Sequence, residues 1–243
     1  MHRRTVLVQL AALFSAACGG GGGPATPAAS APTAGADPVA ANPAPAAAPP
    51  PAPPAPSSPH IAAWGDSLTP RVAFTLAALY PARQVFDGGV NGETSGDILR
   101  RHRADNRHRD WINVFWYGHN NQTQADQIRA DIAASVALLS PGNDRFIVMS
   151  VVNQATEREN RGGADYRTIL ELNESLAATY PAHYLDIRSH LVQQADRSRW
   201  QDAADFDNDV VPRSLRYDHI HLNHDGSRVV AERLKRFIDA KGW

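Results

Sequence analysis

A serine and a histidine–aspartate pair, far apart in the sequence, have the residue types needed for nucleophilic chemistry. Ser67 follows Gly65-Asp66, and Asp218 precedes His221 by three residues. A serine hydroxyl is a weak nucleophile at neutral pH, so an imidazole must accept its proton and a carboxylate must orient that imidazole. Asp218 on the same turn as His221 would contact Nδ1 and leave Nε2 facing Ser67. The three residues therefore predict a catalytic triad.

The elements around Ser67 fit this role. Residues 60–64 are short and mainly apolar, as in a buried strand. Thr69 and Pro70 are typical of an N-cap followed by the first position of a helix. Ser67 is thus expected at the carboxyl end of a strand and before a helix N-terminus, where ligands commonly bind.

Four short blocks, in this order, resemble the GDSL-type esterases of the SGNH hydrolase superfamily. They are Gly65-Asp66-Ser67-Leu68, Gly89-Val90-Asn91-Gly92-Glu93-Thr94-Ser95, Tyr117-Gly118-His119-Asn120-Asn121 and Asp218-x-x-His221. Together they cover residues 60 to about 240. Each block alone is a weak signal, but four in the family's order are specific.

The resemblance implies a site and a reaction. Ser67 would be the nucleophile, with His221 as the base and Asp218 as its carboxylate. The backbone N–H groups of Ser67 and Gly92 and the side-chain amide of Asn120 would form the oxyanion hole. The reaction would be hydrolysis of a carboxylic ester through an acyl-enzyme, without a metal or other cofactor. The favoured substrate is a short acyl or acetyl ester, either a small molecule or a glycan of the cell wall.

Two positions depart from the family pattern. Asn121 stands where the third block usually has aspartate, and Glu93 stands where the second block often has aspartate. Neither change removes the nucleophile, the base or an oxyanion donor. The sequence therefore predicts a variant subfamily, in which the loop around Asn121 is held differently.

Alternating strand-like and helix-like segments predict an α/β fold with three layers, α/β/α, around a mostly five-stranded parallel sheet. Ser67, Gly92 and Asn120 each follow a different expected strand, so they should meet at the carboxyl edge of the sheet. The expected strands are residues 60–64, 84–87, 112–117, 146–152 and 184–187, and the clearest expected helices are residues 124–139, 165–180 and 225–239.

The N-terminal part has the composition of an export signal and a tether. Residues 1–18 contain two arginines, a short apolar core and small residues before Cys18, the chain's one cysteine. This resembles a bacterial lipoprotein signal, with Ser15 in place of the usual leucine. Residues 19–59 are rich in Gly, Ala and Pro and are expected to be disordered. We expect residues 60–243 to form the hydrolase domain, exported to the envelope or periplasm and attached to the membrane through lipidated Cys18, or else secreted.

Composition argues against other partners. The net charge of −1 gives no basis for binding nucleic acid or for broad attraction to anionic membranes. The basic residues between 100 and 109 are balanced locally by Asp105 and Asp110, which predicts a solvated face. The acidic segment 202–216 is expected to be a loop that borders the site and influences substrate choice.

Two other functions fit parts of the chain. One is a zinc-dependent hydrolase, in which Ser67 is incidental. Its zinc ligands would be His219, His221 and His224, with Asp218 or Asp225 as a further ligand. A non-catalytic envelope protein that binds glycans would keep the fold without the reaction. Full activity after chelation would exclude the first, and ester turnover would exclude the second.

Overall fold

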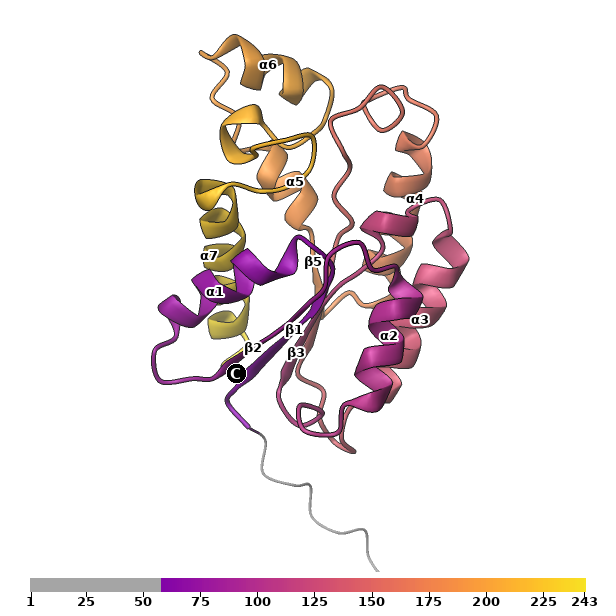
Figure 1. Ribbon diagram of the computed structural model, residues 1–243, viewed down its shortest axis with the longest axis vertical. Coiled ribbons are helices and arrows are strands. Elements are labelled where there is room, and N and C mark those ends of the chain that lie inside the picture. Colours follow the sequence, from indigo (N-terminus) through magenta and orange to yellow (C-terminus); the bar gives the residue numbers. More distant parts are fainter. Residues whose placement is uncertain (1–57) are drawn as a thin grey trace, which may run out of the picture. The chain divides into compact units, whose positions relative to one another are not determined.

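The computed structural model describes residues 58–243, in which five parallel strands form one sheet of order β2-β1-β3-β4-β5 (Figure 1). The predicted α/β fold with a five-stranded parallel sheet is therefore confirmed. The strands are β1 (Ile61–Gly65), β2 (Val85–Gly89), β3 (Ile112–Trp116), β4 (Phe146–Met149) and β5 (Tyr184–Leu185). The α-helices are α1 (Thr69–Leu79), α2 (Ser95–Ala104), α3 (Ala125–Ala137), α4 (Tyr166–Thr179), α5 (Ile187–Val192), α6 (Trp200–Asp207) and α7 (His224–Ala240), with 3₁₀ turns η1 (His119–Asn121) and η2 (Arg213–Leu215).

The sheet is covered on both faces, which gives the predicted three layers. Helices α1, α5 and α7 pack on one face, and α2, α3 and α4 pack on the other (Figure 1). The central strand β1 alternates accordingly, because Ile61 joins the first core while Ala62 and Trp64 join the second. Strands buried on both faces read as continuous apolar runs, as β1, β3 and β4 do.

The strands β4 and β5 are shorter than the sequence predicts. The backbone N–H of Val151 donates to Asn173 Oδ1 at 2.7 Å, which takes it out of the strand ladder. After β5, the Asp186 side chain accepts the N–H of Ser189 at 3.0 Å and so caps helix α5. In both cases a side chain satisfies the backbone earlier than the apolar pattern indicates.

The expected N-cap role of Thr69 is wrong. Helix α1 begins at Thr69 itself, and Leu68 occupies the cap position without a side-chain hydrogen bond. Thr69 is 2% exposed, and its hydroxyl is buried without a hydrogen-bond partner in residues 58–243. A Cβ on Gly65 would lie 2.0 Å from that hydroxyl oxygen, so the threonine packs against the end of β1 instead of capping α1.

The solvated face predicted for the basic segment 100–109 is also wrong in part. These residues include the end of helix α2, which begins with a capping box between Thr94 and Asp97. On that helix His102 is fully buried and Arg101 is half-buried. Burial, the larger cause, and the nearby Arg109 charge lower the pKa of His102 to about 4, so the ring is neutral at physiological pH.

The segment expected to be a loop at residues 202–216 is partly helical. It contains most of α6 and the 3₁₀ turn η2, which are joined by the buried side chain of Asp202. The Asp202 carboxylate accepts the backbone N–H of Ser214 at 3.0 Å and its hydroxyl at 2.6 Å. The sequence pattern does not predict this contact, because the carboxylate joins positions twelve residues apart.

The predictions for the N-terminal signal, Cys18 and most of the linker at residues 19–59 lie outside the described residues. Ser58 and Pro59 are described, and their carbonyl groups accept hydrogen bonds from Arg145 and Arg83. No helix within residues 58–243 combines the length and apolar character needed to cross a membrane.

Candidate active site

Three of the predicted site residues form a hydrogen-bonded chain. His221 Nε2 lies 3.0 Å from Ser67 Oγ, and His221 Nδ1 lies 2.7 Å from Asp218 Oδ2. Ser67 lies in the turn after β1, and the other two lie in the turn before α7. Residues 154 positions apart are thus within direct contact. The arrangement can remove the serine proton and stabilise the resulting imidazolium.

The Asp218 carboxylate is kept ionised by its surroundings. Its Oδ1 accepts the backbone N–H groups of Ile220 at 2.8 Å and His221 at 2.7 Å. Desolvation acts to raise the pKa of Asp218, but these bonds and the contact with His221 outweigh it and lower the pKa to about 2. Asp218 is therefore a carboxylate at neutral pH.

Asp66, beside Ser67, has the opposite environment. It is 1% exposed, and its Oδ1 accepts the N–H of Leu68 at 3.0 Å. No group in residues 58–243 hydrogen-bonds the buried Oδ2. Burial therefore raises the pKa of Asp66 to about 6, against the lowering effects of the Leu68 N–H and the His221 charge. The carboxyl group braces the turn that carries Ser67 at an electrostatic cost.

Gly92 and Asn120, the other predicted oxyanion residues, lie on loops that follow β2 and β3. Gly92 has a φ of +77° and no atom near the position of a Cβ, so the turn needs glycine for its conformation and not for space. The Asn120 Nδ2 donates to the Glu93 carbonyl at 2.9 Å, which ties the two loops together. One amide hydrogen uses this bond, and the other is left for a further acceptor.

Arg101 is a site-supporting residue that the sequence analysis missed. Its guanidinium pairs with Glu93 at 2.6 Å and donates to the carbonyls of Gly88 at 2.9 Å and Gly65 at 3.3 Å. It therefore joins the ends of β1 and β2 to the loop that carries Gly92. The capping box before α2 could have revealed the helix, and its period then places Arg101 on the side facing the sheet.

Asn121 is held by a buried network that explains its departure from the family pattern. Its Oδ1 accepts the N–H of Ser95 at 3.1 Å, and its Nδ2 donates to Ser95 Oγ at 3.0 Å. The Ser95 hydroxyl in turn donates to Asp131 Oδ2 at 2.6 Å. Because the single hydroxyl proton is used on Asp131, the group facing Ser95 Oγ must be a donor. Asparagine satisfies this condition and an ionised aspartate does not.

His119 is a neutral, buried histidine close to the triad. Its Nδ1 lies 3.1 Å from the Val152 carbonyl, so Nδ1 carries the proton and Nε2 is the acceptor. Burial, which is the largest cause, and the charges of His221 and His219 lower the pKa of His119 to about 4. His119 therefore adds no positive charge beside His221 at neutral pH.

The histidines of the proposed metal cluster do not converge. His221 is engaged with Asp218 and Ser67, whereas His219 and His224 are exposed. Within residues 58–243, no group of three or more His, Cys, Asp or Glu side chains is arranged to hold a metal ion.

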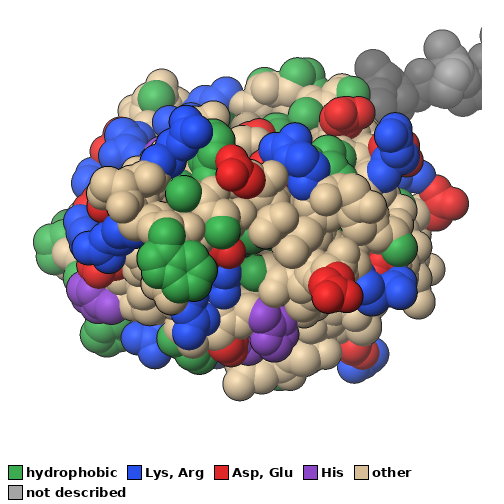
Figure 2. Space-filling model, turned by 90° about the horizontal axis from the view of Figure 1, so that it is seen from above, with side chains coloured by type: hydrophobic (Ala, Val, Ile, Leu, Met, Phe, Trp, Pro, Cys, Tyr) green, Lys and Arg blue, Asp and Glu red, His purple; other side chains and the backbone are tan. Residues whose placement is uncertain are grey.

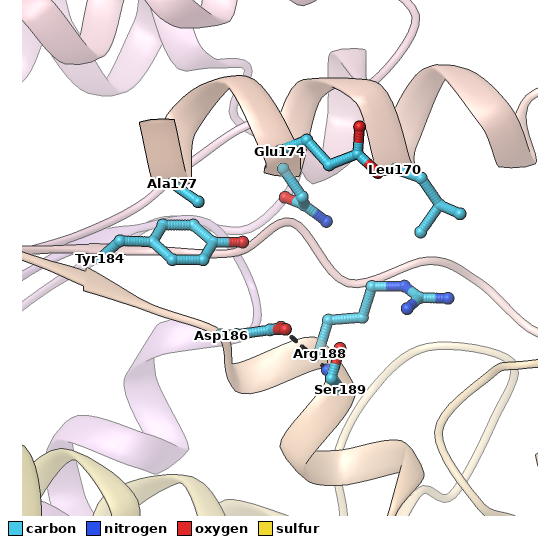
Figure 3. A pocket seen from close by; sticks show the side chains of 8 residues that line it. Leu170, Glu174, Ala177, Tyr184, Asp186, Arg188 and Ser189 are labelled. Carbon is cyan, nitrogen blue, oxygen red and sulfur yellow. Dashed lines mark hydrogen bonds between the residues drawn. The ribbon is translucent and has the colours of Figure 1, made fainter. Parts of the chain in front are cut away.

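A separate cavity of about 230 Å³ lies between α4 and the segment from β5 to α5 (Figure 3). Its lining includes Asn173 and Arg188, which are both buried. Asn173 bonds the N–H and carbonyl of Val151, and Arg188 pairs with Asp209 at 2.6 Å. These polar groups hold the chain together at the edge of the sheet, and none of the triad residues lines this cavity.

Comparisons with known proteins show the fold. Solved structures similar to this chain include a lipase/acylhydrolase from Enterococcus faecalis, with a TM-score of 0.58, 15% identity, and 75% of this chain and 96% of that chain covered. A GDSL-like lipase from Bacteroides thetaiotaomicron has a TM-score of 0.59, 17% identity, and coverage of 75% and 88%. The protein has the SGNH hydrolase fold. A catalytic mutant of an acetylxylan esterase from Geobacillus stearothermophilus is also similar, with a TM-score of 0.55, 17% identity, and coverage of 75% and 94%.

Comparisons of the sequence give less information than the structural comparisons. No protein-family model matches the chain. The tail spike protein of Salmonella phage epsilon15 is 27% identical over 191 residues. The match takes in 73% of this chain but only 17% of the tail spike protein.

The environment of Asp66 predicts a pH-dependent effect of Asp66→Asn. The native carboxyl group keeps its proton to a pH of about 6, whereas its ordinary pKa is 3.8. The native state therefore binds more protons than the unfolded state between these values, and stability falls as the pH rises through them. Removing the charge should stabilise the protein by about 3 kcal/mol at pH 8 and by little at pH 4. Urea unfolding of both proteins at both pH values measures this, and an equal difference at the two pH values would contradict it.

The Asn121 network predicts that Asn121→Asp destabilises the protein. The new carboxylate would face Ser95 Oγ without a donor and add a second acid beside Asp131. A loss of about 1–3 kcal/mol is expected, as for other unsatisfied buried polar groups. The double variant Asn121→Asp with Asp131→Asn, which moves the carboxylate across Ser95, should recover most of the loss. Thermal unfolding of the parent, both single variants and the double variant tests this, and additive losses in the double variant would disprove the account.

Proposed function

We propose that this protein is a serine hydrolase that cleaves carboxylic esters. The observation that carries the proposal is the continuous hydrogen-bonded chain from Asp218 through His221 to Ser67. An ionised carboxylate on Nδ1 and a hydroxyl on Nε2 are what serine activation requires. The likeness in fold to acylhydrolases and to an acetylxylan esterase supports the same reaction class.

The reaction has two stages. His221 Nε2 takes the proton of Ser67 as Oγ attacks the ester carbonyl, and the resulting imidazolium is stabilised by Asp218. The N–H groups of Ser67 and Gly92 and the free amide hydrogen of Asn120 stabilise the oxyanion. His221 then gives its proton to the leaving alcohol, so that the acyl-enzyme forms. Water, deprotonated by His221, attacks that acyl group and releases the acid and Ser67.

An acetyl or other short acyl group on a glycan is the substrate class that we propose. Ser67 is half-buried and the His221 side chain is 32% exposed, so the triad is open enough to reach a group displayed on a larger molecule. The acetylxylan esterase among the similar structures acts, by its name, on such an ester. Export to the envelope and attachment through lipidated Cys18, which would bring the enzyme to cell-wall glycans, remain part of this proposal.

The nucleophile is tested by hydrolysis of p-nitrophenyl acetate and butyrate. The protein should release p-nitrophenol, and Ser67→Ala should lower kcat by about 10³-fold or more while remaining folded. Circular dichroism of both proteins is the control for folding. Equal activity of the two proteins would refute the serine mechanism, and activity lost on chelation would point to a metal hydrolase. No turnover of these esters or of acetylated glycans by the parent protein would favour the binding-protein alternative.

The oxyanion role of Asn120 predicts a selective effect on kcat. Asn120→Ala removes a donor that acts on charge developing in the transition state, at a cost of about 3 kcal/mol. The variant should therefore lower kcat by about 10²-fold and change KM little. Steady-state kinetics with p-nitrophenyl acetate measures both constants. A raised KM with unchanged kcat would assign Asn120 to ground-state binding instead.

A further inference from the structure

A small hollow lies beside the segment that carries His221 and Asp218. Its volume is about 170 Å³, and its walls are helix α6 and the turn at residues 213–216. Trp200, which is 78% exposed, lies in its lining together with Arg213 and Arg216. When the molecule is seen from above, the side on which α6 lies carries hydrophobic side chains close to Lys and Arg side chains (Figures 1 and 2).

The walls of this hollow are fixed to one another and to the triad. Asp205 on α6 pairs with Arg216 at 2.6 Å, and Asp202 bonds Ser214. Arg216 also donates to the Asp218 carbonyl at 2.7 Å, and Arg213 donates to the same carbonyl at 3.3 Å. The residue that orients the base is therefore in direct contact with two side chains of the hollow.

The charges in the hollow do not cancel. Arg216 is 8% exposed, and its charge is compensated by Asp205. Arg213 is exposed, and its guanidinium forms no ion pair with a carboxylate in the described part of the chain, since Asp205 pairs with Arg216. A guanidinium next to an exposed indole can bind a carboxylate while the indole packs against an apolar surface of the same ligand.

Tyr217 follows Arg216 of the hollow in the chain and lies against His221. Its ring stacks on His221, with centroids 5.6 Å apart and an interplanar angle of 11°, and it is 56% exposed. His221 gives its proton to the leaving alcohol, so the alcohol part of an ester must lie at this imidazole. Beyond the imidazole, the next groups along the segment are Tyr217 and then the hollow. Trp, Tyr and Arg are the residue types that most often dominate binding surfaces.

We infer that Tyr217, Arg213 and Trp200 form a binding surface for the alcohol part of the substrate, and that this part is an acidic saccharide. A sugar ring would pack on Trp200, and the carboxylate of a sugar acid would pair with Arg213. This inference rests on the proposed function for its direction, because the position of the leaving alcohol defines which side of the site is used. It assigns the substrate class more narrowly, as an acyl ester of an anionic glycan.

Direct binding tests this surface independently of turnover. Trigalacturonic acid, titrated calorimetrically into the full-length protein carrying Ser67→Ala, should bind, and more weakly as salt is added. Its methyl ester, which has the same rings without the charges, should bind at least about tenfold more weakly. Adding Trp200→Ala or Arg213→Gln should each weaken binding of the acid at least about tenfold. The exposed residues Phe74 and Arg103 provide matched controls, and Phe74→Ala and Arg103→Gln should bind the acid as the parent does.

The outcomes separate this inference from the proposed function. No binding of the acid, equal binding of acid and methyl ester, or unchanged binding in both hollow variants would overturn the inference even if p-nitrophenyl acetate is hydrolysed. Binding with the expected pattern and no ester turnover would instead retain the surface and refute the esterase. Where turnover is present, the kcat/KM ratio of an acetylated acidic oligosaccharide to p-nitrophenyl acetate should fall at least about tenfold in Trp200→Ala. A variant that loses both activities equally would indicate damage to the triad.

Discussion

The in-register parallel pairing of β1 with β2 and β3 is the constraint on which the rest of the site depends. Gly65, the last residue of β1, lies opposite Gly89 and Trp116, the last residues of its two neighbours. Three strands therefore end at one level, and the loops that carry Ser67, Gly92 and Asn120 leave the sheet together. A Cβ at Gly65 or Gly89 would come within 2.0 Å or 2.5 Å of the first residues of α1. Glycine at both positions lets the start of that helix pack against the strand ends beside Ser67.

Charged and polar groups then fix these loops at a buried edge. Arg101 neutralises Glu93 and satisfies two strand-end carbonyls, so burial of its charge is compensated. Asp66 is not compensated in this way, and its raised pKa measures the cost. Asp218 is held ionised by backbone N–H groups. The carboxyl groups of Asp66 and Asp218 thus have pKa values on opposite sides of the ordinary value. Desolvation dominates at Asp66, whereas backbone N–H groups and His221 outweigh it at Asp218.

The segment from α6 to the start of α7 serves both structure and chemistry. Its buried side chains, Asp202 and Arg216, tie the outer helix to the turn before α7. The same turn presents Asp218 and His221 to Ser67. Arg216 donates a hydrogen bond directly to the Asp218 carbonyl, so one side chain connects the outer surface to the triad. Substrate selection and orientation of the base can therefore involve one short stretch of chain.

The sequence by itself determined the fold class, all five strands and the residues that meet at the triad. Apolar runs and helical periods depend on short-range spacing, and the catalytic residue types are recognisable in local blocks such as Asp218-x-x-His221. Only the tertiary structure decided which polar groups are buried and what they bond. It showed that Thr69 is the first residue of α1 and not its cap, and it placed the Arg101 guanidinium against the ends of two strands. It also showed that the bond from Ser95 to Asp131 is the reason for asparagine at position 121. These outcomes depend on partners that are distant in sequence, and their burial determines both hydrogen bonding and charge.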